Sequence, residues 1–311
     1  MTQALFDIDS KTPVIIQGVT GRMGRRHAEL MRAYGTNIVG GTSARPGDAG
    51  PEGLHVSRSC RDVVTATGAT ASVAMVPPYE VLAAASEAIQ AGIRVVVTVA
   101  EGVPVHDALR LRAVAREAGA VWLGASTPGM ALPGRAKLGF IPDVALKSGS
   151  WALLTKSGTL SYEVGYRMGA RGLGQSIWIG VGGDVVKGVR FADLVGPLAR
   201  HAPTRGVILV GEVGGTEEEQ FAEAIRSTGF AKPVLALLAG RESKEGVSMG
   251  HAGAMTDGLM GTLRSKVEAL RASGAEAFDS IEALVDRAAG LSEAPQQRGA
   301  GASTEVEGRS R

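Results

Sequence analysis

The sequence predicts an α/β protein with two doubly wound domains, on the basis of three observations. Short runs rich in Val, Ile and Leu alternate along the chain with segments of helical period, which is typical of parallel sheets built from βαβ units. The chain has 311 residues, enough for two domains that each bury a core. Its 44 glycines and 4% aromatic content indicate many tight turns around aliphatic packing.

The first domain is expected over residues 1–126. Apolar runs predict its buried strands at Val14–Gln17, Ile38–Gly40, Ala71–Val76, Val95–Val99 and Val121–Gly124. Helical periodicity and terminal glycines predict the helices between them at Gly24–Gly35, Tyr79–Gly92 and His106–Gly119.

The second domain is expected over residues 151–291. Its predicted strands are Trp151–Thr155, Ile177–Val181, Val207–Val210 and Val234–Leu238. Its predicted helices are Thr159–Gly172, Phe191–Arg200, Glu217–Ser227 and Gly261–Ser273. Residues 127–150, rich in Pro and Gly, are interpreted as an interdomain connector or, equally, a binding loop. The polar, Gly- and Ser-containing stretch 292–311 predicts a disordered tail.

Composition excludes several classes of function. A formal net charge of +2 gives no field strong enough to favour nucleic acid or a membrane surface as a partner. A single cysteine, Cys60, rules out an internal disulfide and a cysteine cluster for a metal, and no metal site is predicted. The N-terminus carries acidic residues without a long apolar core, and no run reaches the roughly 18 apolar residues of a membrane span. We therefore expect a cytoplasmic protein.

A glycine-rich turn follows the first predicted strand and opens the first helix. Gly18, Gly21 and Gly24 are spaced G-x-x-G-x-x-G, so the turn misses the strict G-x-G-x-x-G dinucleotide pattern. Such a turn lets the backbone and the helix N-terminus approach a pyrophosphate, although the glycines could equally serve tight packing. The second strand ends without the acidic residue that holds an NAD ribose, which disfavours a nicotinamide cofactor; Arg45 in the next loop could meet a phosphate.

A second helix start has the same design. Ser157, Gly158 and Thr159 follow a predicted strand and open a helix, where backbone N–H groups, hydroxyls and the helix dipole would hold an anion. Ser and Thr also favour this position as structural N-caps. The two interpretations are about equally supported by these residues alone.

A histidine among small residues is the strongest candidate for chemistry. His251 lies in MGHAGA, and neutral imidazole is a nucleophile at cellular pH that can accept a phosphoryl group and pass it on. Glu212 could accept from its second N–H and fix the tautomer. A turn-capping histidine and a solvated carboxylate are the alternatives. In a parallel sheet, however, Ser157–Thr159, Asp184, Glu212 and His251 all fall at one edge.

Seven motifs occur in a single order between Thr12 and about Ala289. They are QGVTGRMG, VAEGVP, TPGMALPG, KSGTLSYE, VGGD, GEVGG and MGHAGA. In these motifs the chain resembles the α subunit of succinate–CoA ligase (succinyl-CoA synthetase). The resemblance implies a Rossmann-like CoA-binding domain followed by a flavodoxin-like parallel α/β ligase domain.

The resemblance also implies roles for individual residues. His251 matches the phosphohistidine, Glu212 the residue that supports it, and Tyr162 a residue near the acyl substrate. The phosphate-holding helix start corresponds to Ser157, Gly158 and Thr159. The positions that match CoA contacts are Thr20, Gly21, Arg22, Met23, Val99, Ala100 and Glu101, with Arg45 as a neighbouring substitute for the family's lysine.

A partner chain is implied as well. The sequence has no G-x-x-x-x-G-K-[ST] motif, so Mg-ATP or Mg-GTP would be bound by a β-type ATP-grasp subunit in an αβ or α₂β₂ assembly. The chain has ARPGD at 44–48 where the family has PGKGG, and GASTPG at 124–129 where it has GPNCPG. Ala100 and Lys156 replace a common Thr and Arg. These changes are consistent with an acid other than succinate, such as malate or another hydroxy or substituted carboxylate. The rival hypotheses are a CoA-binding regulatory subunit and an NAD-linked oxidoreductase.

Overall fold

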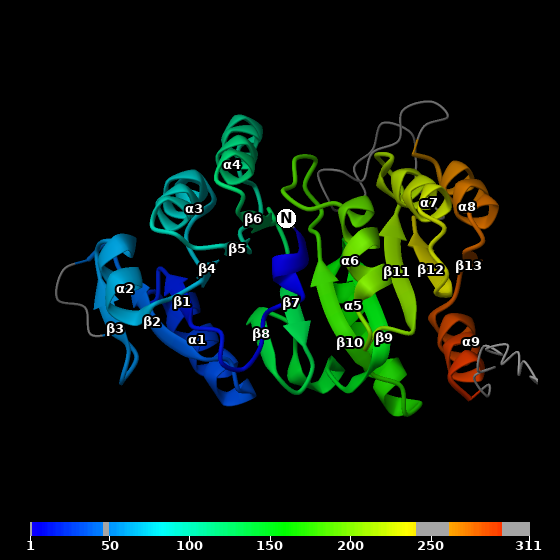
Figure 1. Ribbon diagram of the computed structural model, residues 1–311, viewed down its shortest axis with the longest axis horizontal. Helices are drawn as coiled ribbons and strands as arrows, with labels where there is room; N and C mark the ends of the chain where they lie inside the picture. The colour runs from blue at the N-terminus through cyan, green and yellow to red at the C-terminus, as the bar shows by residue number, and fades with distance from the viewer. Residues whose placement is uncertain (1, 46–49, 241–260, 294–311) are drawn as a thin grey trace, which may run out of the picture.

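Two α/β lobes lie side by side in the computed structural model, which describes residues 2–45, 50–240 and 261–293 (Figure 1). The first lobe holds a six-stranded sheet and the second a seven-stranded sheet. The expected succession of two α/β domains is confirmed.

The first sheet is parallel throughout, with the strand order β3-β2-β1-β4-β5-β6. This is the Rossmann order, in which a topological switch point separates β1 from β4. The strands are β1 (Val14–Gln17), β2 (Ile38–Thr42), β3 (His55–Ser57), β4 (Ala71–Ala74), β5 (Val95–Thr98) and β6 (Val121–Leu123).

The helices of this lobe are η1 (Thr2–Leu5), α1 (Arg22–Tyr34), α2 (Cys60–Thr67), η2 (Pro78–Glu80), α3 (Val81–Gln90) and α4 (Val105–Glu117). Strand β3 and helix α2 are not predicted by the sequence, because β3 is three residues long and only partly buried. The signals for α2 are its caps. Ser59 accepts from the Asp62 N–H at 3.3 Å, and Gly68 ends the helix at φ +68°.

The second sheet has the order β13-β12-β11-β9-β10-β7-β8. Five of its strands are parallel and follow the flavodoxin order, counted from β9 as the first of the lobe. These strands are β9 (Ser148–Thr155), β10 (Gln175–Gly180), β11 (Gly206–Glu212), β12 (Val234–Ala239) and β13 (Glu276–Phe278).

Residues 127–150, interpreted from sequence as a connector or binding loop, contribute strands to the second sheet instead. They form the antiparallel hairpin β7 (Gly129–Leu132) and β8 (Ala136–Gly139), which pairs with β10, and the start of β9. The two outer glycines face each other in the hairpin, and a Cβ on Gly129 would lie 1.9 Å from the Leu138 carbonyl oxygen. The glycines therefore allow close strand pairing, and the sheet is mixed rather than purely parallel.

The helices of the second lobe are η3 (Asp143–Ala145), α5 (Gly158–Ala170), η4 (Phe191–Leu194), α6 (Val195–Arg200), α7 (Glu217–Ser227), α8 (Leu263–Ala272) and α9 (Ile281–Glu293). Strand β13 and helix α9 are not among the elements predicted from the sequence. Helix α9 packs beside α5, where Arg167 and Arg171 pair with Glu282. Helix α9 runs to Glu293, so the predicted tail does not begin at residue 292. Residues 294–311 lie outside the described residues.

Alternation along the strands divides the interior into layers. In β1, Val14 and Ile16 join the core cluster shared by both lobes, whereas Ile15 joins the cluster under α2, α3 and α4. In β9, Leu154 belongs to the shared cluster and Leu153 to the cluster under α5 and α9. Each sheet is therefore buried on both faces, as its continuous apolar strands require.

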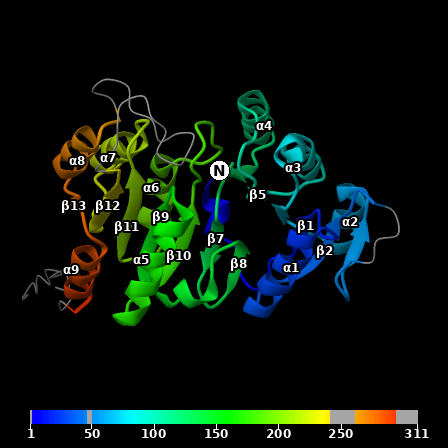
Figure 2. The ribbon, with the colours of Figure 1, turned by 180° about the vertical axis from the view of Figure 1, so that it is seen from behind.

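The hairpin β7–β8 also joins the two lobes, and it lies between them when the molecule is seen from behind (Figure 2). The hydroxyl of Thr36, just after α1, donates to the Lys137 carbonyl at 2.8 Å and accepts from the Lys137 N–H at 3.0 Å. The Gly134 N–H donates to the Tyr34 hydroxyl at 3.1 Å. The end of α1 is thereby hydrogen-bonded to the second sheet.

Two glycines of α5 should respond oppositely to alanine. A Cβ at Gly165 would lie 2.5 Å from the Trp178 ring and 2.8 Å from the Ala145 carbonyl oxygen, whereas one at Gly169 meets nothing within 4 Å. We expect Gly169→Ala to stabilise the protein by about 0.5–1 kcal/mol through helix propensity. Gly165→Ala should destabilise it by roughly 1–3 kcal/mol through overpacking. Thermal unfolding of both variants checks this; a stabilised Gly165→Ala would contradict the packing.

Candidate functional site

The predicted CoA contacts gather at the carboxyl edge of the first sheet. Thr20 lies in the loop after β1 and Arg45 in the loop after β2. The Thr20 hydroxyl hydrogen-bonds the Ser43 hydroxyl at 2.6 Å, and the Arg45 N–H donates to the same Ser43 oxygen at 3.2 Å. The two loops are therefore connected directly beside the switch point, where open α/β sheets bind ligands.

The start of α1 has the features of an anion site. Gly21 is its N-cap and provides no side-chain cap, and the first turn contains no acidic residue. Arg22 and Met23 open the helix and are exposed. A cation at the positive end of a helix dipole is unfavourable unless an anion binds there. The packing alternative also holds in part, because a Cβ at Gly24 would lie 2.1 Å from the Gly18 carbonyl oxygen.

The remaining predicted CoA contacts follow β5. Val99 and Ala100 are partly buried, and Glu101 is exposed. The Ala100 carbonyl accepts from the Ser126 N–H at 3.0 Å, which holds this loop against the segment after β6. The loops after β1, β2 and β5, together with the first residues of α1, thus supply all the predicted positions of the first lobe.

A cavity of about 380 Å³ lies at the carboxyl edge of the second sheet. The loop after β10, the end of β11, the residue after β9 and the start of α7 form its walls, so four parts of the chain contribute to one site. Its lining residues are Lys156, Gly183, Asp184, Val185, Lys187, Arg190, Glu212, Gly214, Gly215, Thr216, Glu217 and Gln220.

The start of α5 shows the capping role that sequence left open. The Ser157 hydroxyl accepts from the Leu160 N–H at 3.4 Å, and Gly158 is the first residue of the helix. Thr159 is exposed. Tyr162 packs its ring 6.2 Å from that of Trp178, and burial raises the pKa of its phenol. No acidic residue lies in the first turn, so the dipole of α5 stays available to an anion.

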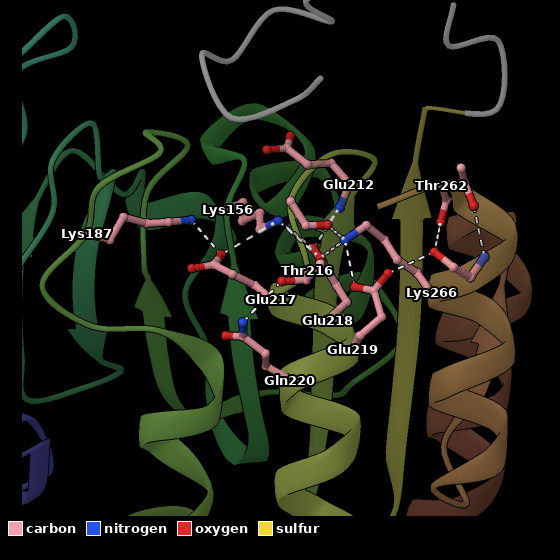
Figure 3. A network of polar contacts seen from close by, with 12 residues as sticks. Lys156, Lys187, Glu212, Thr216, Glu217, Glu218, Glu219, Gln220, Thr262 and Lys266 are labelled. Carbon is pink, nitrogen blue, oxygen red and sulfur yellow. Dashed lines mark hydrogen bonds and ion pairs between the residues drawn. The ribbon is translucent and has the colours of Figure 1, made fainter. Parts of the chain in front are cut away.

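A network of buried charges adjoins the cavity and supplies three of its lining residues, Lys156, Lys187 and Glu217 (Figure 3). The Lys156 ammonium is 2.8 Å from Glu218 Oε1 and 3.6 Å from Glu217 Oε2. Lys187 donates to Glu217 Oε2 at 2.6 Å and to the Gly182 carbonyl at 2.9 Å. The Glu218 side chain is 0% exposed, so these charges depend on each other rather than on solvent.

The pKa values reflect this mutual dependence. Burial opposes ionisation of Glu218, but the charges of Lys156 and Lys266 outweigh it and lower the pKa of this carboxyl. Burial likewise opposes the charge on Lys156, but Glu218 and Glu217 outweigh it and raise its pKa. For Lys187, burial prevails and its pKa is lowered.

Glu212 ends β11 and is 7% exposed. Its backbone N–H donates to Glu218 Oε1 at 3.2 Å, while its carboxylate points away from the charge network (Figure 3). The structure therefore brings Lys156, Asp184 and Glu212 together around one cavity. His251 lies outside the described residues, so its placement at this edge remains a prediction.

Sequence reasoning missed Lys187, Glu217, Glu218 and Lys266. The three glutamates that open α7, Glu217 to Glu219, are the one available signal, since acidic residues favour a helix N-terminus on dipole grounds alone. The lysines that pair with them come from elsewhere in the chain, and no spacing rule connects those positions. Among the described residues, no cluster of three or more His, Cys, Asp or Glu side chains could hold a metal ion, and no helix is long and apolar enough to cross a bilayer.

Fold and site together define a two-domain α/β protein with an uncapped helix start at the carboxyl edge of one sheet and a charged cavity at that of the other. Family models match both parts: a CoA binding domain over residues 9–102 and a CoA-ligase domain over residues 154–276. Subunit α 2 of an ADP-forming succinate–CoA ligase from Archaeoglobus fulgidus is 42% identical over 270 residues, covering 86% of this chain and 93% of that protein.

Two further comparisons agree. The α subunit of a malate–CoA ligase from Methylorubrum extorquens is 35% identical over 271 residues, covering 86% of this chain and 91% of its own length. The structure of ATP citrate lyase from Methanothrix soehngenii, in complex with citrate and coenzyme A, matches with a TM-score of 0.81 over 91% of this chain and 50% of that one; at 21% identity it supports the fold. The chain belongs to the family of CoA-ligase α subunits.

The charge network should make stability depend on pH. Because the pKa of Glu218 is lowered from its ordinary 4.5, its pairing stabilises the fold above that value and is lost as the pH falls through the folded-state pKa. We expect Glu218→Gln to cost about 3–5 kcal/mol at neutral pH, and this cost should shrink in acid.

Urea unfolding at neutral and acidic pH measures the difference. Glu223→Gln is the matched control, since Glu223 forms an exposed pair with Arg226 on the same helix; its effect should stay below about 1 kcal/mol at either pH. An equal cost for Glu218→Gln at both pH values would contradict the ion-pair account.

Proposed function

We propose that this chain is the α subunit of an ADP- or GDP-forming acid–CoA ligase that acts through phosphorylated His251. The observation that carries the proposal is Glu212, which lies on the wall of the charged cavity at the strand edge where α5 also begins. The motif MGHAGA in the same chain, and 42% identity with a succinate–CoA ligase subunit, support the chemistry.

The proposed reaction consists of three transfers. The terminal phosphoryl group of the nucleotide moves to a His251 ring nitrogen, and the nucleoside diphosphate leaves. A carboxylate oxygen of the acid then takes the phosphoryl group from His251, giving an acyl phosphate. Finally the CoA sulfur, having lost its proton, attacks the acyl carbon, and inorganic phosphate leaves. Each transfer is reversible.

Residues of the second lobe have distinct parts in this scheme. Glu212 accepts from the second N–H of the His251 imidazole, which fixes the tautomer and stabilises the charge of the phosphorylated ring. The start of α5, with Ser157, Gly158 and Thr159, holds the phosphoryl oxygens through backbone N–H groups and the helix dipole. Tyr162 lies one turn further along α5, beside the acyl substrate. These roles rest on position and on the family's motifs.

The first lobe binds CoA in this proposal. The phosphates of CoA lie against the start of α1, near Thr20, Gly21, Arg22 and Met23. Arg45 neutralises the charge of a further phosphate. The loop after β5, with Val99, Ala100 and Glu101, borders the remainder of the cofactor. Support comes from the uncapped start of α1 and from the match of residues 9–102 to the CoA binding domain.

The proposal includes a β-type ATP-grasp partner that binds Mg-ATP or Mg-GTP, in an αβ or α₂β₂ assembly. The relatives are named as α subunits, and the sequence lacks a nucleotide P-loop. The acid is a small carboxylic acid such as succinate or malate. The cavity of about 380 Å³ has ample room for such a molecule, and Arg190 provides a cation on its wall.

Substitution of the histidine tests the central step. We expect His251→Asn, co-purified with its β-type partner, to take up no acid-labile phosphate from labelled ATP or GTP with Mg²⁺, because the amide is not a nucleophile. His106→Asn, at an exposed position on α4, is the control and should label normally. Label in the His251→Asn complex, or no label in the wild-type complex, would defeat the proposal; the second result favours a CoA-binding regulatory subunit.

A separate variant tests the CoA site. We expect Arg22→Ala to raise the KM for CoA by about 10–100-fold, the loss of one charge-assisted phosphate contact. Histidine phosphorylation should be unchanged, since that step needs no CoA. Arg116→Ala, an exposed arginine in the last turn of α4, is the control. A wild-type KM for CoA in Arg22→Ala would place the phosphates elsewhere.

A further inference from the structure

Lys266 is a fully buried lysine whose purpose the reaction scheme leaves unexplained. It lies on α8, and its side chain is 0% exposed. Its ammonium donates to the Gly215 carbonyl at 2.8 Å, to Glu219 Oε2 at 3.1 Å and to Glu218 (Figure 3). One ammonium thus joins α8 to the loop after β11 and to the first turn of α7.

Other contacts hold the start of α8 in the same place. The Gly214 N–H donates to the Gly261 carbonyl at 2.8 Å. Gly261 has φ +71°, and a Cβ there would lie 2.6 Å from the Gly215 carbonyl oxygen. The Ser265 hydroxyl donates to Glu219 Oε1 at 2.8 Å. The chain is therefore attached to the loop after β11 at the point where α8 begins.

Glu218 connects this attachment to Glu212. Its Oε2 pairs with Lys266, while its Oε1 accepts from the Glu212 N–H at 3.2 Å and lies 2.8 Å from Lys156. A single carboxylate therefore sets the position of the Glu212 backbone relative to α8. The segment that enters α8 is the one whose sequence carries His251.

The energetics favour a positioning role over a stabilising one. Buried ion pairs are often no more stable than apolar side chains of similar volume, because desolvating the charges offsets their attraction. Three lysines and three glutamates collected at one sheet edge are a costly way to fill a core. What they provide is a fixed arrangement of the four chain segments that they join.

We propose that Lys266 and Glu218 are positioning residues for phosphoryl transfer. They hold the backbone of Glu212 in register with Gly261 and the start of α8, and Glu212 is the residue that supports His251 in the proposed function. The inference rests on the proposed function. Neither residue touches the reacting atoms; both act through Glu212.

The test compares broken and balanced forms of the network. Lys266→Met leaves the network with one more buried negative charge than positive charges, whereas Lys266→Met combined with Glu218→Gln removes one charge of each sign. Arg264→Met, on the same helix in an exposed pair with Glu268, is the matched control. Each is made in the α–β complex, with three readouts: the rate of His251 phosphorylation from labelled ATP and Mg²⁺, the thermal midpoint and the KM for CoA.

Lys266→Met should lower both the midpoint and the phosphorylation rate. The double variant should recover most of the midpoint, since balanced removal of buried charges is close to neutral. Its phosphorylation rate should nevertheless stay about tenfold or more below wild type, because a small misplacement of a reacting pair is costly. The KM for CoA should stay within about twofold of wild type, since CoA binds in the other lobe. The control should match wild type throughout.

Recovery of both the midpoint and the rate in the double variant would overturn the inference and leave a merely structural network. A wild-type rate in Lys266→Met would do the same. In both cases the labelled wild-type complex keeps the proposed function intact, whereas an unlabelled wild-type complex removes both. If the double variant does not fold, Lys266→Arg keeps the charge but changes the donor geometry. A slowed rate in that folded variant supports the inference, and an unchanged rate overturns it.

Discussion

The buried carboxylate of Glu218 is the interaction on which the second lobe depends. It is fully enclosed, and it is paired with Lys156 from the end of β9 and with Lys266 from α8. Because an isolated charge in such a place would be prohibitively costly, its partners must reach it from separate elements before the lobe is complete. The same carboxylate accepts from the backbone of Glu212. The contacts that enclose this carboxylate therefore also position the chain segments that form the cavity walls.

Three helices that begin at the carboxyl edges of the sheets differ in the charges of their first turns. The first turn of α7 carries three glutamates, which neutralise its dipole and fill its N-terminus with the protein's own carboxylates. The first turns of α1 and α5 carry none, and α1 begins with Arg22. The positive end of the α7 dipole is therefore neutralised by the protein's own carboxylates. Those of α1 and α5 remain suited to an external anion. In the proposed function those anions are CoA phosphates and a transferred phosphoryl group.

The arrangement of the lobes follows from the hairpin β7–β8. It extends the second sheet and is hydrogen-bonded to Tyr34 and Thr36 at the end of α1. The two lobes also share a core cluster. A flexible connector would not fix the position of one carboxyl edge relative to the other. Hydrogen bonds between the hairpin and the end of α1 fix the carboxyl edge of the first sheet relative to the cavity of the second lobe.

The alternation of strand and helix can be predicted from local sequence patterns, because both periodicities are local and most strands lie between two apolar layers. Glu217–Ser227 was predicted with the bounds that α7 has, and Asp184 and Glu212 were expected at one sheet edge, where the structure places them around one cavity. Elements without strong local signals were missed: the partly buried β3, and the hairpin whose glycines were interpreted as a loop.

The charge network, in contrast, arises from contacts between residues that are far apart in the sequence. Lys266 and Glu218 are 48 positions apart, and Lys156 and Glu218 are 62 apart. No periodicity connects them, since their contact depends on the order in which β9, β11 and α8 are laid side by side. In sequence each is a charged residue typical of a solvated surface. Their burial is a property of the whole fold, and it makes them the ion-paired network that contacts the backbone of Glu212.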